Sequence, residues 1–450
     1  MLADNSPLTT REQLTEVFRA SEKPAEQFRV GVEAEKFVVD RTTFQPMPYA
    51  GPRGAEGLFS YMSEHFGWSA KAEVPGGPPI SLEREGASIT LEPGAQFELS
   101  GAPHFTLAQV EAELVRHNAE LKVLQDQFDL AFLHVGFHPW AKHADLPWVP
   151  KRRYPIMKSY LPTRGSRGVD MMLRTATVQV NLDYSSEHDA MLKLVTLSRL
   201  TPLLRAAFLN SPFIEGARGE RLGERLDVWL NMDPARSGVL EQLWTLDNPR
   251  YADYAEWALD AGMFLFTRDG QVVANTGQTF RAFMRDGFEG HRATPADWKL
   301  HLGTLFPEIR LKNTLEIRFA DTLPAELAMS LPALLVGLSY DPLALEQARE
   351  LAAKVSPVGV GALHRAVAVS GLATPFDGGR VRDAVERLID IAAAGLARLA
   401  PQAADARYLE PLQRLVAQGQ TPAELLIADW GRSGKALQEF LVARFSQAGD

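Results

Sequence analysis

The chain has 450 residues, a formal net charge of -9 and no cysteine. Without a lysine or arginine tract, this charge argues against nucleic acid or an anionic membrane as the main partner. The lack of cysteine excludes disulfides, thiol nucleophiles and zinc sites built on thiolates. The first 18 residues hold no basic segment followed by an apolar run, and no later stretch has the length of a membrane span. We therefore expect a cytoplasmic protein.

The first three quarters of the chain mix helical and strand patterns. A helix is predicted over residues 11–19, and the first strand begins near Arg29. Further strands with period-2 alternation are predicted at 87–100, 129–137, 175–184 and 310–319, and amphipathic helices at 107–128 and 187–209, the second interrupted by Pro202. Because these elements do not form regular βαβ units, they predict an α+β fold with an antiparallel sheet.

After Tyr340 the strand patterns fade and helical patterns remain. The segment TPAELLIADW begins with a capping box, in which Thr421 is the cap, Pro422 the first-turn proline and Glu424 the box partner. We expect residues 1–340 to form a catalytic α+β domain and residues 341–450 a helical subdomain packed on it. The alternative is one integrated domain.

Acidic side chains gather on single faces of the predicted strands. In VGVEAEKFVV, Glu33 and Glu35 are two residues apart, so their side chains lie on one side at a spacing of roughly 7 Å. Glu98 and Glu316 lie on other alternating strands, and Gln179 adds an amide oxygen. Oxygen ligands of this kind suit Mg²⁺ or Mn²⁺. Each strand alone is more typical of an antiparallel sheet with one face in solvent, but together the strands indicate a metal-lined cavity.

Basic residues close to these acids indicate phosphate chemistry. Arg318 lies two residues from Glu316 on the same face, where a guanidinium can neutralise a transferring phosphate. The basic segment 151–168 either folds over phosphates or forms a solvated surface loop, because it lacks the P-loop pattern. His134 and His138 lie on an apolar strand, which favours structural roles over metal binding.

Several long motifs stand along the chain, each of them once: GVEAEKF, SITLEPGAQFELSGAP, MMLRTATVQVNLDY, HLGTLFPEIRLKNTLEIRFAD and GQTPAELL. From about residue 25 to about residue 430 they resemble, in the same order, the glutamate-cysteine ligases shared by plants and many bacteria. The resemblance implies a fold related to glutamine synthetase, with an antiparallel sheet curved into a funnel. It also implies that ATP phosphorylates the γ-carboxylate of glutamate and that the amine of cysteine attacks the acyl phosphate, which is the first step of glutathione synthesis.

The resemblance also implies roles for single residues. By position, the metal ligands are Glu33, Glu35, Glu98, Gln179 and Glu316, with Glu316 and Arg318 as the catalytic pair. The nucleotide or phosphate contacts are Arg310, Lys312 and Lys36, although Lys36 alternates to the face opposite Glu35. Arg174 and Arg236 resemble substrate-binding residues. The expected cofactors are Mg²⁺, with Mn²⁺ possible, and ATP as co-substrate; the expected partners are small-molecule substrates only, in a monomer or homodimer.

The chain departs from the family pattern at two positions. Ala34 stands where many members carry His, and Thr322 stands where we expect Cys. The thiol switch of the plant enzymes therefore cannot exist here, while the predicted metal and phosphate residues are intact. Two alternatives to cysteine ligation remain open at this stage, a γ-glutamyl ligase that uses a different amine and a non-catalytic nucleotide-binding relative.

Overall fold

The computed structural model describes residues 6–447, and a nine-stranded sheet lies at the centre of these residues. Eight strands follow the order β14, β15, β7, β1, β5, β4, β3 and β2, and β6 pairs with the far end of β1. Every neighbouring pair in this sheet is antiparallel. The predicted α+β class is therefore confirmed. The strands are β1 (Val30–Asp40), β2 (Ser69–Ala72), β3 (Pro79–Arg84), β4 (Ala87–Leu91), β5 (Phe97–Ser100), β6 (Leu130–Leu133), β7 (Thr177–Leu182), β14 (Ile309–Leu311) and β15 (Leu315–Asp321).

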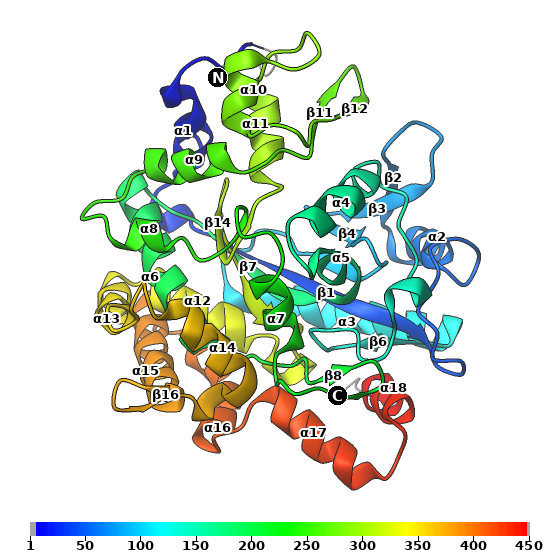
Figure 1. Ribbon diagram of the computed structural model, residues 1–450. Coiled ribbons are helices and arrows are strands. Elements are labelled where there is room, and N and C mark those ends of the chain that lie inside the picture. Colours follow the sequence, from blue (N-terminus) through cyan, green and yellow to red (C-terminus); the bar gives the residue numbers. More distant parts are fainter. Residues whose placement is uncertain (1–5, 448–450) are drawn as a thin grey trace.

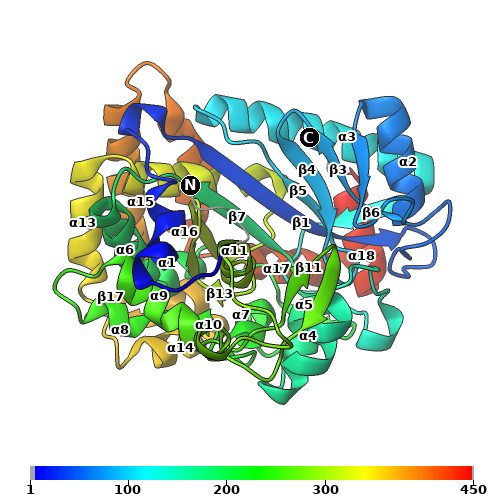
Figure 2. The ribbon, with the colours of Figure 1, turned by 90° about the horizontal axis from the view of Figure 1, so that it is seen from above.

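The long strand β1 crosses the molecule and organises the sheet (Figures 1 and 2). Its first part lies between β7 and β5, and its last four residues pair with β6. Val30, Val32 and Ala34 are buried in the core. Because side chains alternate along a strand, burial of these three directs Glu33 and Glu35 to the opposite face.

Two predicted strands are in fact hairpins. Residues 87–100 form β4 and β5 around a turn in which Ala95 has a φ of 62°. Residues 310–319 divide into β14 and β15, so that Arg310 lies directly opposite Glu316. In both segments the apolar residues keep the same phase before and after the turn, and a pattern of period 2 alone therefore cannot locate the turns. The strand predicted at 129–137 also ends early, at Leu133.

Helices cover both faces of the sheet. α2 (Ala55–Phe66) and α3 (Leu107–Phe128) pack on the strands β1, β2, β3 and β6. α4 (Tyr154–Tyr160), α5 (Gly168–Arg174) and α7 (Glu224–Leu230) lie over the face that carries Glu35, because all three share a cavity with it. The other helices before residue 325 are α1 (Arg11–Arg19), α6 (Glu187–Ala206), α8 (Glu241–Trp244), α9 (Tyr251–Asp260), α10 (Phe280–Asp286) and α11 (Pro295–Leu302). The short strands are β8 (Phe213–Ile214), β9 (Ala217–Arg218), β10 (Ser237–Gly238), β11 (Leu265–Arg268), β12 (Gln271–Ala274) and β13 (Phe306–Pro307).

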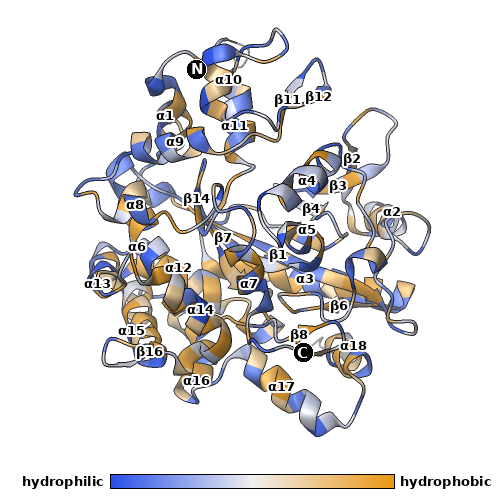
Figure 3. Cartoon of the chain, in the orientation of Figure 1, coloured by the Kyte–Doolittle hydropathy of each residue, from blue (hydrophilic) through white to orange (hydrophobic). Residues whose placement is uncertain are grey.

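The last quarter of the chain is almost entirely helical. Its helices are α12 (Ser330–Ser339), α13 (Pro342–Ala352), α14 (Val360–Ser370), α15 (Val381–Leu399), α16 (Glu410–Ala417), α17 (Pro422–Ser433) and α18 (Leu437–Gln447), and a small hairpin joins β16 (Pro375–Phe376) to β17 (Gly379–Arg380). The hydropathy colours in Figure 3 show α12 as mainly hydrophobic. α12 and α15 touch where a Cβ on Gly395 would lie 2.1 Å from the carbonyl oxygen of Gly337. Glycine at both positions therefore permits this close crossing.

Within residues 6–447 no helix by itself has the length and hydropathy of a membrane span. The bent pair Ala325–Ser339 and Pro342–Ala352, which meet at 96°, reaches those values only when both helices are taken together.

Candidate active site

Four glutamates predicted as metal ligands lie on one side of the central sheet. Glu35 lies directly opposite Glu98 of β5, and Glu33 lies opposite Gln179 of β7. Glu316 belongs to β15, the strand beyond β7. Because directly opposite residues project to the same side of a sheet, the register brings these side chains onto a single surface.

Glu35 and Glu98 form a buried pair of carboxylates, each 7% exposed. The backbone N–H of Thr177 donates to Glu35 Oε2 at 3.0 Å, and the hydroxyl of Thr90 donates to Glu98. Burial, the charge of Glu98 and the charge of Glu92 raise the pKa of Glu35 well above its usual range. Burial and Glu92 raise the pKa of Glu98 to about 8. Two buried acids that repel each other in this way are stabilised by a bound cation.

Glu316 has the opposite electrostatic environment. Its carboxylate contacts Arg310 Nη2 at 2.5 Å, Lys312 Nζ at 2.8 Å and the guanidinium of Arg318. Burial alone would raise the pKa of Glu316, but the charges of Arg310, Lys312 and Arg318 outweigh burial and hold the pKa well below its usual range. Arg318 also donates to Gln179 Oε1. In this arrangement Glu316 anchors three cationic side chains, and it does not share the excess negative charge of the Glu35–Glu98 pair.

A cavity of about 100 Å³ lies against Glu35 and Arg318. Glu92 adds a carboxylate from the turn between β4 and β5, Arg153 adds a guanidinium from the residue before α4, and Arg225 adds another from α7. The remaining lining residues are polar or apolar but uncharged: Pro93, Gln96, Tyr154, Met157, Met171, Met172, Thr175, Thr177, Trp229, Gly303, Thr304 and Phe306. The cavity therefore combines two acids, three guanidiniums and an apolar wall.

Comparison with known proteins identifies the family. The family model for glutamate-cysteine ligase family 2 matches residues 29–441. The chloroplastic glutamate-cysteine ligase of Brassica juncea is 39% identical over 431 residues, which cover 94% of this chain and 82% of that protein. The chain belongs to this ligase family. The resemblance read from the motifs is thus confirmed, and the chloroplastic enzyme of Arabidopsis thaliana gives the same 39% identity over 94% of this chain and 81% of its own length.

The solved structures support the fold expected for a glutamate-cysteine ligase. A crystal structure of glutamate-cysteine ligase from Francisella tularensis in complex with AMP matches with a TM-score of 0.58 at 14% identity, covering 95% of this chain and 89% of that chain. The expectation of a cytoplasmic protein is contradicted, because the similar curated ligases from Brassica, Arabidopsis and rice are chloroplastic.

None of the five residues that the resemblance implicated in nucleotide or substrate binding lines this cavity, and two of them, Arg310 and Lys312, contact Glu316 instead. Arg174 is 4% exposed and pairs with Asp170 at 3.2 Å. Arg236 is fully buried, pairs with Asp233 at 2.8 Å and donates to backbone carbonyls. Lys36 points to the other face of β1, where burial lowers its pKa to about 8. Arg174, Arg236 and Lys36 therefore lie outside the cavity that carries Glu35 and Arg318.

Three charged residues that line the cavity, Glu92, Arg153 and Arg225, were not found from the sequence. Glu92 lies in the turn after β4, within the residues 87–100 that were predicted as one alternating strand, and the pattern alone did not single it out. Arg153 lies in the basic segment 151–168, which contains α4 and the 3₁₀ turn Leu161–Thr163 and ends where α5 begins. Arg225 lies in the first turn of α7, away from the motifs. The clustering of basic residues in 151–168 was the one signal available for Arg153.

The donor chemistry of the ligase site fits a hard divalent cation. Among residues 6–447 no group of three or more His, Asp or Glu side chains is close enough to hold a metal ion as it stands. Glu35 and Glu98 nevertheless supply carboxylate oxygens in a buried pair, and Glu92 adds to their repulsion. Oxygen donors with surplus negative charge suit Mg²⁺, so the fit is best at this pair and poorest at the already neutralised Glu316.

Proposed function

We propose that the protein joins the γ-carboxylate of glutamate to the amine of cysteine through a γ-glutamyl phosphate, with ATP as the phosphoryl donor. Family membership gives the class of reaction. The single observation that carries the proposal is the cavity in which Glu35 and Glu92 face Arg153, Arg225 and Arg318. Carboxylate substrates and phosphate groups both need cationic partners of this kind.

Glu35 and Glu98, with Glu92 beside them, would hold Mg²⁺, which supplies charge neutralisation for the triphosphate. Arg318 is placed by Gln179 and Glu316 so that its guanidinium reaches the cavity. There it stabilises the charge that develops on the transferring phosphoryl group.

Arg153 and Arg225 are assigned to the carboxylates of glutamate. Both line the cavity, and neither contacts Glu316, which already has three cationic partners. Arg225 also donates to two backbone carbonyls and lies 3.7 Å from Asp321, so only the part of its guanidinium that faces the cavity is assigned to glutamate. Burial lowers the pKa of Arg225 to about 10, so the residue stays cationic at neutral pH. A guanidinium fork matches a carboxylate in geometry and fixes the orientation of the substrate.

The apolar wall protects the acyl phosphate. Met157, Trp229 and Phe306 line the cavity beside the charged groups. Their side chains exclude water, which would otherwise hydrolyse the activated carboxyl group before the amine attacks it. No covalent intermediate with the protein is required, because the amine displaces phosphate directly from the acyl carbon.

The decisive test measures γ-glutamylcysteine, ADP and phosphate from ATP, glutamate and cysteine, with a panel of other amines run in parallel. Equimolar formation of the three products with cysteine supports the proposal. Robust turnover with a non-thiol amine and none with cysteine would assign a different acceptor. Absence of phosphate release with every amine would indicate a nucleotide-binding relative without catalysis.

A further inference from the structure

Arg318 lies in an irregular part of β15. The register between β15 and β7 shifts between Ile317 and Ala320, so Arg318 and Phe319 together form a β-bulge. A bulge bends its strand and re-aims the side chains that it carries. The side chain of Arg318 contacts Gln179 and Glu316 and lines the cavity. The direction of this guanidinium therefore depends on what holds the bulge.

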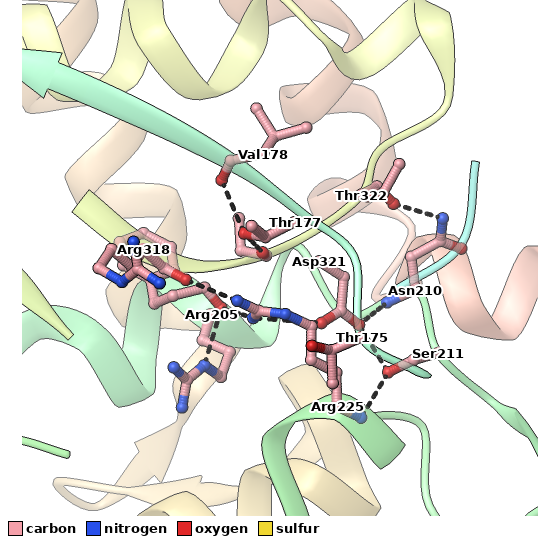
Figure 4. A network of polar contacts seen from close by, with 12 residues as sticks. Thr175, Thr177, Val178, Arg205, Asn210, Ser211, Arg225, Arg318, Asp321 and Thr322 are labelled. Carbon is pink, nitrogen blue, oxygen red and sulfur yellow. Dashed lines mark hydrogen bonds and ion pairs between the residues drawn. The ribbon is translucent and has the colours of Figure 1, made fainter. Parts of the chain in front are cut away.

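Two buried arginines, Arg205 and Arg225, donate hydrogen bonds to the backbone carbonyl groups of the bulge (Figure 4). Arg225 donates to the carbonyl oxygens of Arg318 at 2.9 Å and Phe319 at 3.2 Å. Arg205 Nε donates to the oxygen of Phe319 at 3.1 Å. Without these donors, two peptide oxygens that β7 does not pair would be left unsatisfied in the interior.

Arg205 also reaches the other hydrogen-bonding side of the bulge. Its guanidinium forms an ion pair with Glu308, and the backbone oxygen of Glu308 accepts the N–H of Arg318 at 3.0 Å. His364 Nδ1 lies 3.3 Å from Arg205 Nη1. Arg205 is 2% exposed, belongs to α6 and does not line the cavity. It therefore contacts the bulge only from behind.

We propose that Arg205 is a positioning residue: through the Arg318–Phe319 bulge it holds the guanidinium of Arg318 in the orientation that phosphoryl transfer requires. This inference rests on the proposed function, because it assigns Arg318 to the transferring phosphoryl group. A purely structural Arg205 would only neutralise the buried Glu308. The two roles predict different activities for a variant in which Glu308 is neutral and needs no cation: a structural Arg205 is then dispensable, whereas a positioning Arg205 is still required for activity.

The test compares Arg205→Lys with the double variant Arg205→Met/Glu308→Gln, which removes the positive charge and the buried negative charge together. Because a misplacement of about 1 Å can cost on the order of 100-fold in rate, we expect the double variant to lose kcat by that factor. The KM values for glutamate and cysteine should stay within about threefold of wild type, since Arg153 and Arg225 are retained. The kcat of Arg205→Lys should fall between those of wild type and the double variant, because an ammonium keeps the positive charge but not the planar arrangement of donors of a guanidinium.

Arg199→Met is the matched control. Arg199 lies on the same helix and donates to the carbonyl oxygens of Ala353 and Val355 at 3.0 Å each, away from the bulge. We expect its kcat to be unchanged. A double variant with nearly wild-type kcat would overturn the positioning role.

A crystal structure of the double variant gives a readout that does not depend on activity. We expect the Arg318 side chain to leave Gln179, and an unmoved Arg318 would overturn the proposal even if kcat falls. If wild-type protein makes no γ-glutamylcysteine, the proposed function fails, but the crystal structure still tests whether Arg205 positions Arg318.

Discussion

His138 gives the sharpest test of the electrostatics of the interior. The side chain is 1% exposed, and its Nδ1 accepts the backbone N–H of Ala141 at 3.0 Å. Nε2 is buried without a hydrogen-bond partner in the described structure. Burial, and then the charge of Arg174, lower the pKa of His138 to about 3. We predict that His138→Asn, whose amide oxygen can replace Nδ1 as the acceptor, makes the fold less sensitive to acid.

The magnitude follows from proton linkage. In the unfolded chain His138 has a pKa of about 6.5, so below that pH the unfolded state binds a proton that the folded state rejects. Stability is lost as pH falls, by about 1 kcal/mol at pH 5.5 and about 2 kcal/mol at pH 5. His134, His301 and His364 have pKa values lowered to about 3 by burial as well. All four groups therefore lower the stability of the fold as pH falls.

The assay is urea unfolding of wild type and His138→Asn at pH 7.5, 6.5, 5.5 and 5. The contributions of all other titrating groups cancel in the difference between the free energies of unfolding of the two proteins. Relative to its value at pH 7.5, this difference should favour the variant by about 2 kcal/mol at pH 5. His188 is exposed, so His188→Gln serves as the control and should leave the pH dependence unchanged. A constant difference between wild type and His138→Asn across this range would refute the reasoning.

Three further substitutions test the buried lysine behind the sheet and two residues of the candidate active site. Lys36→Met should keep wild-type kcat and raise the free energy of unfolding at pH 7 by up to about 3 kcal/mol, because folding lowers the pKa of Lys36 from 10.5 to about 8. Urea unfolding should show that this gain is absent above pH 10.5, where the lysine is neutral in the folded and the unfolded state. Glu98→Gln should raise the Mg²⁺ concentration for half-maximal activity more than ~10-fold, and an unaltered Mg²⁺ titration would remove Glu98 from the metal site. Arg153→Met should raise the KM for glutamate ~10- to 100-fold, the loss of a charge-assisted hydrogen bond, and an unchanged KM would place glutamate elsewhere.

The acidic face of the sheet could be predicted because it depends on strand periodicity. Alternation alone assigns Glu33 and Glu35 to one side, and antiparallel pairing then aligns them with Gln179 and Glu98. The prediction did not require the order of the strands. It survived two overlooked hairpin turns, because each turn leaves Glu98 and Glu316 on that same side.

The basic half of the cavity could not be predicted in the same way. Arg153 and Arg225 come from the starts of helices α4 and α7, and only tertiary packing brings them to the sheet. Arg174 and Arg236 were chosen for their motifs, yet their guanidiniums pair with acids three or four residues away, Asp170 and Asp233. Local ion pairs of this kind leave no signature that separates them from substrate contacts.

The division of the chain at residue 340 leads to a last prediction. We propose that residues 341–450 are not a separable unit, because α13, α14 and α15 pack on α6, and every residue of α12 is buried. Leu388 of α15 and Leu200 of α6 belong to one continuous core.

A chain that ends at residue 340 would expose the buried faces of α6 and α12, including the surface of Gly337 that receives α15. Large exposed apolar patches cause aggregation, so we expect this fragment to be insoluble when it is expressed alone and soluble when it is co-expressed with residues 341–450. A soluble fragment of residues 1–340 that unfolds cooperatively would show that the sheet and its first helices form a core of their own.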